Sequence, residues 1–328
     1  MTHKAPKWPP KLRELARSVL RWVSMATPTR GRVVLVSFLV DLFDIVTNLI
    51  VAIITGSAVV FAEMAQGIAD SLGSAFLVIG DRRAGRPRDE EHPLGYEREA
   101  FFWAVLSAVA MLFVGAGLSG LRGYRQLTDP QELSDSWLAI GVLVLAIVTN
   151  SYAVSLSVRN LTENGIHGVI DRFREGSQPL VKSALLRDVI GTTTSIIGLV
   201  ALILYAALDA VEFDAAGAIA AAVMMSFAAV VLMAQARGLI TGQSVPERDL
   251  ERLRIVVSGT PGVEALNSLV AVHSGANHVR VELDLDLEDD LETNDIEVLL
   301  DEVEARIREE MPEVSDLRVD LNSSDLLG

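Results

Sequence analysis

The sequence predicts an α-helical polytopic membrane protein with six transmembrane helices, followed by a small cytoplasmic α+β domain. Three observations lead to this prediction. Half of the 328 residues are hydrophobic and the mean hydropathy is +0.37, which is high for a soluble protein of this length. Six apolar stretches have roughly the 20 residues that a helix needs to cross ~30 Å of hydrocarbon. Residues 246–328 hold 22 Asp and Glu against 7 Lys and Arg, which accounts for the whole net charge of −15.

These breaks in composition divide the chain into three parts. Residues 1–32 form a basic amphipathic segment, 33–240 the six-helix domain, and 246–328 the acidic domain. In the first part, apolar residues fall mostly on one helical face, which suits a helix lying on the inner leaflet; a frayed basic tail is the alternative. This segment is not a signal peptide, because no suitable apolar run follows its basic residues.

The apolar stretches carry few charges, and the loops between them show which side faces the cytoplasm. Lys and Arg gather in the N-terminal segment and in the second and fourth loops, which predicts that both termini are cytoplasmic, with the cell membrane as the expected location. The six predicted helices are Val33–Thr55, Ser57–Ile79, Phe101–Leu121, Trp137–Val158, Leu180–Tyr205 and Phe213–Gln235.

The acidic C-terminal part has the patterning of a soluble domain. Alternating apolar residues predict half-buried strands, and apolar residues at helical spacing predict amphipathic helices, the second of which Asn294 would cap. The predicted order αββαβ consists of Pro246–Ser258, Ala265–His273, His278–Leu287, Asn294–Glu310 and Leu317–Leu321.

Composition also excludes several classes of function. The chain has no cysteine, which excludes disulfides, thiolate metal sites and cysteine nucleophiles. A net charge of −15 argues against nucleic acid as a partner, because phosphate binding needs a basic face. No zinc-protease motif or nucleophile elbow is present, so we do not expect an enzyme.

Polar residues recur at helical spacing inside three of the predicted transmembrane helices. Spacings of three, four and seven residues place each set on one helical face. The sets are Asp41, Asp44 and Asn48 in the first helix, Glu63, Gln66 and Asp70 in the second, and Asp188, Thr192 and Ser195 in the fifth.

The free-energy cost of placing these acids inside a membrane indicates their role. An acidic side chain at the centre of a membrane helix costs ~2.5–3.5 kcal/mol, so five unpaired carboxylates would cost on the order of 15 kcal/mol. The only basic residues in these three helices are Lys182 and Arg187, toward the cytoplasmic end of the fifth helix. We therefore predict a bound cation or proton as the partner of most of the acids. Hydrogen bonding between helices through protonated acids is the structural alternative.

Motifs in this region resemble the cation diffusion facilitator family. They are Asn48, Gly56-Ser57-Ala58, Ala62-Glu63-x-x-Gln66-x-x-x-Asp70 and the loop Asp89-Glu90-Glu91-His92-Pro93-Leu94-Gly95-Tyr96. The glycine-rich third helix is similar to a divergent branch that includes mitochondrial zinc exporters. The resemblance implies a dimeric metal/proton antiporter with six helices and a cytoplasmic ferredoxin-like domain.

The resemblance also implies a transport site. The family pairs His or Asp with an Asp four residues later in the second and fifth helices; here the pairs are Gln66 with Asp70 and Ala184 with Asp188. Both aspartates remain, but both nitrogen ligands are lost. The remaining polar residues would complete an all-oxygen site with an outer layer; they are Asp41, Asp44, Asn48, Glu63 and Ser195.

A second metal site is implied in the loop. Asp89 and His92 match a loop site seen in parts of the family, although Tyr96 stands where the second histidine would be. An ordinary capped loop is the alternative. His273 and His278 in the acidic domain are weaker candidates for a regulatory metal.

The transported ion stays open at this point. Oxygen ligands suit harder ions such as manganese, iron or magnesium, whereas the resemblance favours zinc. We expect export of a divalent cation from the cytoplasm by proton antiport, with no resident cofactor. The alternative is a non-transporting relative that acts in metal sensing or dimerisation, because both nitrogen-ligand positions have changed.

Overall fold

A computed structural model describes residues 30–161, 179–275, 278–289 and 291–322. The chain separates into two units, Met1–Phe43 and Asp44–Gly328, and each is considered by itself. The described part of the first unit is the beginning of helix α2. Most of the basic N-terminal segment predicted at residues 1–32 lies outside the described residues.

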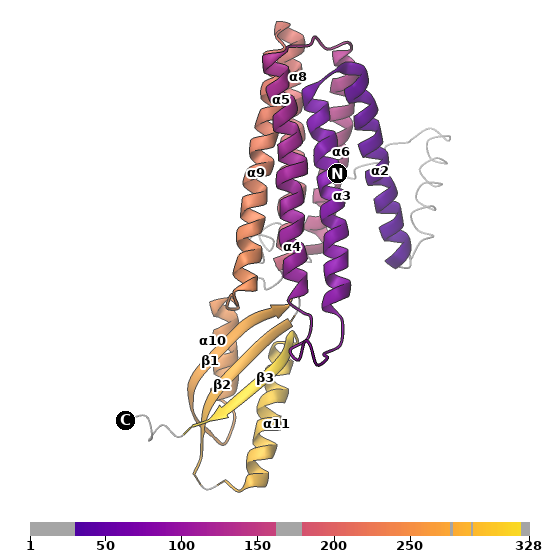
Figure 1. The fold of residues 1–328 in the computed structure, drawn as a ribbon. Coiled ribbons are helices and arrows are strands. Elements are labelled where there is room, and N and C mark those ends of the chain that lie inside the picture. Colours follow the sequence, from indigo (N-terminus) through magenta and orange to yellow (C-terminus); the bar gives the residue numbers. More distant parts are fainter. Residues whose placement is uncertain (1–29, 162–178, 276–277, 290, 323–328) are drawn as a thin grey trace, which may run out of the picture. The chain divides into compact units, whose positions relative to one another are not determined.

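Helices stand where each of the six apolar stretches predicted one (Figure 1). Several extend past the apolar stretch, as α3 does through Arg82 and Arg83, because charged side chains leaving the hydrocarbon do not end a helix. Within the described residues the helices are α2 (Arg30–Thr55), α3 (Ala58–Ala84), the continuous α4, η1 and α5 (Glu99–Ala110, Met111–Gly117, Leu118–Thr128), α6 (Ser136–Leu161), α8 (Pro179–Leu208) and α9 (Glu212–Ile240).

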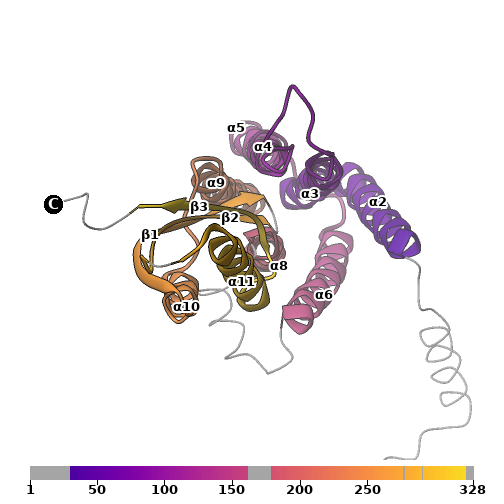
Figure 2. The ribbon, with the colours of Figure 1, turned by 90° about the horizontal axis from the view of Figure 1, so that it is seen from below.

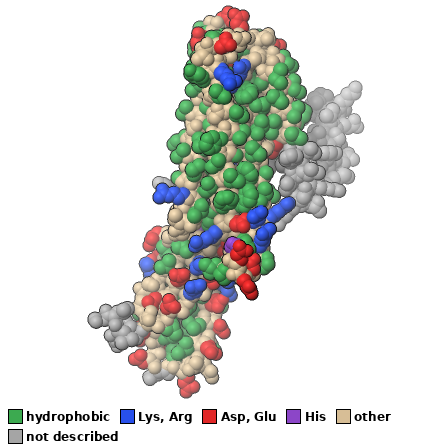
Figure 3. Space-filling model, viewed as in Figure 1, with side chains coloured by type: hydrophobic (Ala, Val, Ile, Leu, Met, Phe, Trp, Pro, Cys, Tyr) green, Lys and Arg blue, Asp and Glu red, His purple; other side chains and the backbone are tan. Residues whose placement is uncertain are grey.

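Alanines dominate one buried cluster of the helical domain, between α3, α4, α8 and α9, among them Ala62 and Ala108. A second cluster holds larger side chains such as Leu143 and Leu202. Many large apolar side chains also point outward: Ile53 is 74% exposed and Phe113 is 69% exposed. Figure 3 shows this apolar surface over the helices. Small residues inside and large ones outside are typical of helices that pack against one another within lipid.

Length and composition alone identify three helices of the described part that could cross a membrane: Glu99–Thr128, Leu186–Leu208 and Glu212–Ile240. Ser136–Tyr152 is apolar but shorter. Helix α3 differs because it carries the buried Glu63 and, further along, Asp70.

The third helix contains a π-helical stretch, η1, in the glycine-rich region. A Cβ atom at Gly115 would lie 3.0 Å from the Met225 sulfur and 3.3 Å from the Ala69 Cβ. The Ser119 hydroxyl donates to the Gly115 carbonyl oxygen at 2.6 Å. The glycine therefore allows the close helix approach that the sequence indicates.

The C-terminal domain has the predicted order αββαβ. Strand β2 pairs antiparallel with β1 and parallel with β3, so the sheet order is β1-β2-β3. Both helices pack on one face of the sheet (Figures 1 and 2). The elements are α10 (Glu247–Ser258), β1 (Val263–Gly275), β2 (His278–Leu287), α11 (Thr293–Glu310) and β3 (Val314–Leu321).

The core of this domain comes from the apolar positions that the alternation marked. Val281, Leu283 and Leu285 of β2 are at most 2% exposed and pack against Val303 and Ile307 of α11. One local prediction is wrong: Asn294 does not cap α11. The helix begins at Thr293, which places Glu292 at the cap position, and Glu292 makes no side-chain capping bond. Asp295 in the first turn suits the positive end of the helix.

Candidate transport site

A buried polar contact joins three helices of the domain. Glu63 of α3 is 8% exposed and accepts a hydrogen bond from the Ser195 hydroxyl of α8 at 2.8 Å. The Asn150 amide of α6 donates to Glu63 at 3.4 Å and to the Ser195 oxygen at 3.1 Å. Glu63 and Ser195, both predicted site residues, are thus in direct contact. Asn150, which could have been packing alone, belongs to the same network.

One turn further along α3, Gln66 contacts the same face of α8. Its side-chain oxygen accepts from the Thr194 hydroxyl at 2.6 Å, and both residues are buried. Thr192, which the helical spacing favoured, instead donates to the backbone oxygen of Asp188 in its own helix at 3.0 Å. Sequence reasoning missed Thr194 because helical spacing does not fix the absolute rotation of a helix.

Asp70 has a protein cation beside it. The Arg187 Nε atom lies 3.5 Å from an Asp70 carboxylate oxygen, and the Arg187 side chain is only 12% exposed. The other end of the guanidinium donates to the buried Ser107 hydroxyl of α4. Arg187 is therefore a protein cation beside Asp70, and a bound ion or proton as the partner of the acids stays a prediction.

The first helix contributes a buried amide. Asn48 is fully buried and donates to the Asp44 carboxylate at 3.1 Å, while its own side-chain oxygen has no hydrogen-bond partner. Asp44 and Asp70 are near enough to Glu63 to act on it electrostatically. Asp188 is half-buried, and Asp41, in the first unit, is exposed.

The predicted ligands are not gathered into one closed site. Among the described residues, no three His, Asp or Glu side chains lie together in a group that could hold a metal ion. What the structure brings together is a sequence of contacts along α3: Glu63 with Ser195 and Gln66 with Thr194, both on α8, and Asp70 with Arg187. Such a column can bind a cation only if side chains rearrange around it.

The predicted loop residues form a compact turn. Asp89 accepts from the Tyr96 hydroxyl at 2.7 Å and from the His92 backbone N–H at 2.7 Å, and the His92 ring lies 4.1 Å from the Tyr96 ring. The hydrogen bond from Tyr96 is the main cause that lowers the pKa of Asp89, and the same bond raises the pKa of Tyr96. The two predicted loop ligands lie close together, with His92 Nδ1 3.7 Å from an Asp89 carboxylate oxygen, and a metal ion between them stays a prediction.

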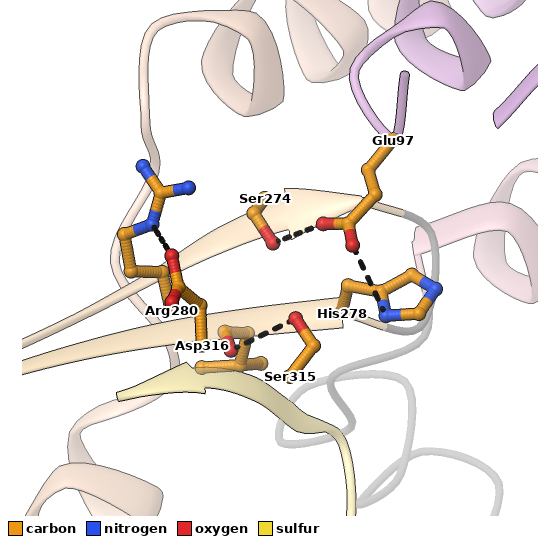
Figure 4. A network of polar contacts seen from close by, with 7 residues as sticks. Glu97, Ser274, His278, Arg280, Ser315 and Asp316 are labelled. Atoms are coloured by element: carbon orange, nitrogen blue, oxygen red, sulfur yellow. Dashed lines mark hydrogen bonds and ion pairs between the residues drawn. The ribbon is translucent and has the colours of Figure 1, made fainter. Parts of the chain in front are cut away.

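The loop also contacts the C-terminal sheet. Glu97 accepts from the Ser274 hydroxyl at 2.8 Å and lies 3.6 Å from the His278 ring nitrogen (Figure 4). Arg280 and Asp316 form an ion pair at 2.9 Å in the same network. A cavity of about 330 Å³ is lined by residues 91–99 together with Ser274 and Arg280. His278, a weak metal candidate, is therefore part of a contact between loop and sheet.

Asp214 is a buried, hydrogen-bonded acid that the sequence analysis did not single out. It is fully buried at the start of α9 and accepts from the Ser57 hydroxyl and from the backbone N–H groups of Ala58 and Val59, at 2.6, 2.6 and 3.2 Å. These donors form the first turn of α3, so Asp214 caps the helix that carries the site. Its position in an acidic first turn was the available signal.

Comparison with known proteins identifies the family. A family model described as the cation efflux transmembrane domain matches residues 34–238, and one described as the cation efflux protein cytoplasmic domain matches residues 245–323. The chain belongs to the cation efflux family. It is a multi-pass membrane protein of a transporter family, not an enzyme, and the cation diffusion facilitator resemblance is confirmed.

Three similar proteins are 23–25% identical to this chain over the aligned residues. The mitochondrial proton-coupled zinc antiporter SLC30A9 of Xenopus laevis is 23% identical over 286 residues, which are 83% of this chain and 50% of that protein. The human protein of the same name is 23% identical over 311 residues, 91% of this chain and 54% of its own length. The cation-efflux pump FieF of Yersinia pestis is 25% identical over 254 residues, 76% and 78% of the two chains. The chain spans about half the length of the SLC30A9 proteins that it matches.

Proposed function

We propose that this protein exports a divalent metal cation from the cytoplasm in exchange for protons, as a homodimer in the cell membrane with both termini inside. The observation that carries the proposal is the polar column on α3, where the buried Glu63 and Gln66 and the half-buried Asp70 each contact a polar side chain of α8. Buried carboxylates within membrane helices are costly, and they mark ion or proton pathways.

The family supports transport of a cation, and the side chains support a divalent one. Glu63, Asp70, Asp188 and Asp44 offer several negative charges, and the amides of Gln66 and Asn48 add neutral oxygen ligands. Zinc is the ion in the names of the SLC30A9 relatives. Oxygen ligands alone suit manganese, iron or magnesium equally well, so we propose the class of divalent cations.

Proton exchange follows from the same carboxylates. A carboxylate that loses its cation in a low-dielectric site is stabilised by taking up a proton. Glu63, bound by Ser195 and Asn150, is the best placed for this role because it is nearly completely buried.

Uptake into proteoliposomes tests the proposal. The purified chain would be reconstituted with a pH gradient and supplied with Zn²⁺, Mn²⁺, Fe²⁺ or Mg²⁺ in turn. We expect proton-driven uptake of at least one ion, and a loss of roughly tenfold or more in Asp70→Asn. Asp81→Asn, which removes an exposed acid from the same helix, is the matched control and should match the wild type. Equal rates in Asp70→Asn and wild type would contradict the assignment of Asp70.

A non-transporting metal sensor is the second candidate, and two contacts favour it. Gln66 is engaged by Thr194 and Asp70 by Arg187, so both positions of the helix pair already have protein partners. This candidate predicts that Zn²⁺ or Mn²⁺ changes the dimerisation of the full chain while none of the four ions crosses the membrane.

A further inference from the structure

Arg187 occupies a slot that three residues of two other helices form around it. Asp70 supplies a negative charge, and Ser107, 2% exposed, accepts a hydrogen bond from one guanidinium nitrogen. Gly73 supplies space: a Cβ atom there would lie 2.7 and 2.9 Å from the two terminal nitrogens of Arg187. The same Cβ atom would lie 2.7 Å from the Ser107 Oγ, so an alanine at position 73 would require the Arg187 or Ser107 side chain to shift.

We propose that Arg187 is a tethered cation that holds Asp70 whenever the transport site is empty and leaves it when a divalent metal ion binds. The inference rests on the proposed function and adds a positioning residue to it. Arg187 and the metal ion would alternate at the half-buried carboxylate of Asp70, so that a positive charge lies beside it in both states.

The contact geometry suits such an exchange. Arg187 Nε and the Asp70 carboxylate are 3.5 Å apart, and Nε makes no hydrogen bond, so the ion pair lacks the bidentate geometry that makes arginine pairs strong. The hydrogen bond to Ser107 does not involve Asp70. The guanidinium can therefore move away from Asp70 and still keep a buried partner.

The alternation of Arg187 and a metal ion at Asp70 would also select divalent over monovalent cations. A monovalent cation brings no more charge to Asp70 than the guanidinium that it must displace. A divalent ion at the same distance is attracted twice as strongly, since Coulomb energy scales with charge. Na⁺ and K⁺ should then be rejected by Arg187, although the oxygen ligands alone would accept them.

Binding measurements on the full-length protein in detergent test this role without relying on transport. Dissociation constants for Zn²⁺ and Mn²⁺, and the rise in melting temperature that each ion produces, would be measured for four variants. Arg187→Gln removes the cation, Arg187→Lys keeps it, and Gly73→Ala crowds the guanidinium so that it must shift, while its charge stays in the protein. Gly80→Ala is the control, because its Cβ would crowd Trp103 of α4 at 2.8 Å and meet no charged group.

We expect Arg187→Gln and Gly73→Ala to bind the metals about tenfold more tightly. Their melting temperatures should also rise more than that of the wild type when metal is added. Arg187→Lys should stay near the wild type, and Gly80→Ala should keep wild-type affinity even if it melts lower. Na⁺ should in addition raise the melting temperature of Arg187→Gln. The double variant Arg187→Gln with Gly73→Ala should bind Zn²⁺ and Mn²⁺ no more tightly than Arg187→Gln alone.

The outcomes separate the two proposals. If the wild type binds metal and both Arg187→Gln and Gly73→Ala bind with unchanged affinity, Arg187 is a structural ion pair and the alternation is overturned while the proposed function stands. If Arg187→Gln binds more tightly but Gly73→Ala does not, Arg187 acts as a fixed charge, which also overturns alternation. Metal binding by none of the proteins would overturn both proposals.

Discussion

The cap that Asp214 provides for α3 gives the sharpest stability prediction. Its carboxylate accepts three hydrogen bonds in a fully buried position. Asp214→Asn keeps the shape but presents an amide N–H₂ to the Ala58 N–H, which then has no acceptor. A lost bond to a charged group with an unsatisfied donor costs about 2 kcal/mol. Asp214→Ala removes both acceptor oxygens, and with them all three hydrogen bonds, and should cost about 4 kcal/mol.

Thermal unfolding of the protein in detergent measures these costs. At about 3 °C per kcal/mol for a chain of this class, the melting temperature should fall by roughly 6 °C in Asp214→Asn and roughly 12 °C in Asp214→Ala. Glu212→Gln is the matched control, because it removes an exposed acid from the same helical turn and should change stability by less than about 0.5 kcal/mol. If Asp214→Asn melted within error of Glu212→Gln, the capping argument would be refuted.

Three further predictions concern the loop, the polar column and the acidic domain. Tyr96→Phe should raise the pKa of Asp89 toward the ordinary value of about 3.9, as carbon NMR would show. The lowered pKa stabilises the wild-type loop above that pH, and this stabilisation is lost as the pH falls through the lowered pKa; Tyr96→Phe should reduce it, because only the bond from the His92 backbone remains. Glu63→Gln should slow turnover more than it weakens Zn²⁺ binding, and Asp188→Asn should do the reverse; an affinity loss confined to Glu63→Gln would contradict this order. Residues 246–328 should fold and dimerise alone, with a melting temperature that rises between low salt and ~1 M salt because their charge of −15 is then screened, and a melting temperature that did not rise would count against the electrostatic argument.

Much of the fold could be predicted because it depends on local properties of the chain. A run of about 20 apolar residues is set by the thickness of the hydrocarbon layer, so the six helices could be placed without knowing their neighbours. The alternation in β2 and the apolar stripe of α11 likewise predict αββαβ. The start of α11 was misplaced by one residue because several polar residues there can begin a helix.

Within the site, the sequence by itself determined which helices carry polar faces, and the contact between Glu63 and Ser195 agrees with those faces. Only the tertiary structure decided the partners. Thr194 rather than Thr192 meets Gln66, Arg187 reaches Asp70, and Asp214 caps a helix more than 150 residues away in sequence. Spacing along one helix fixes the angles between its own side chains. The rotation of that helix against its neighbours depends on packing, where small residues such as Gly73 let backbones and side chains of other helices approach.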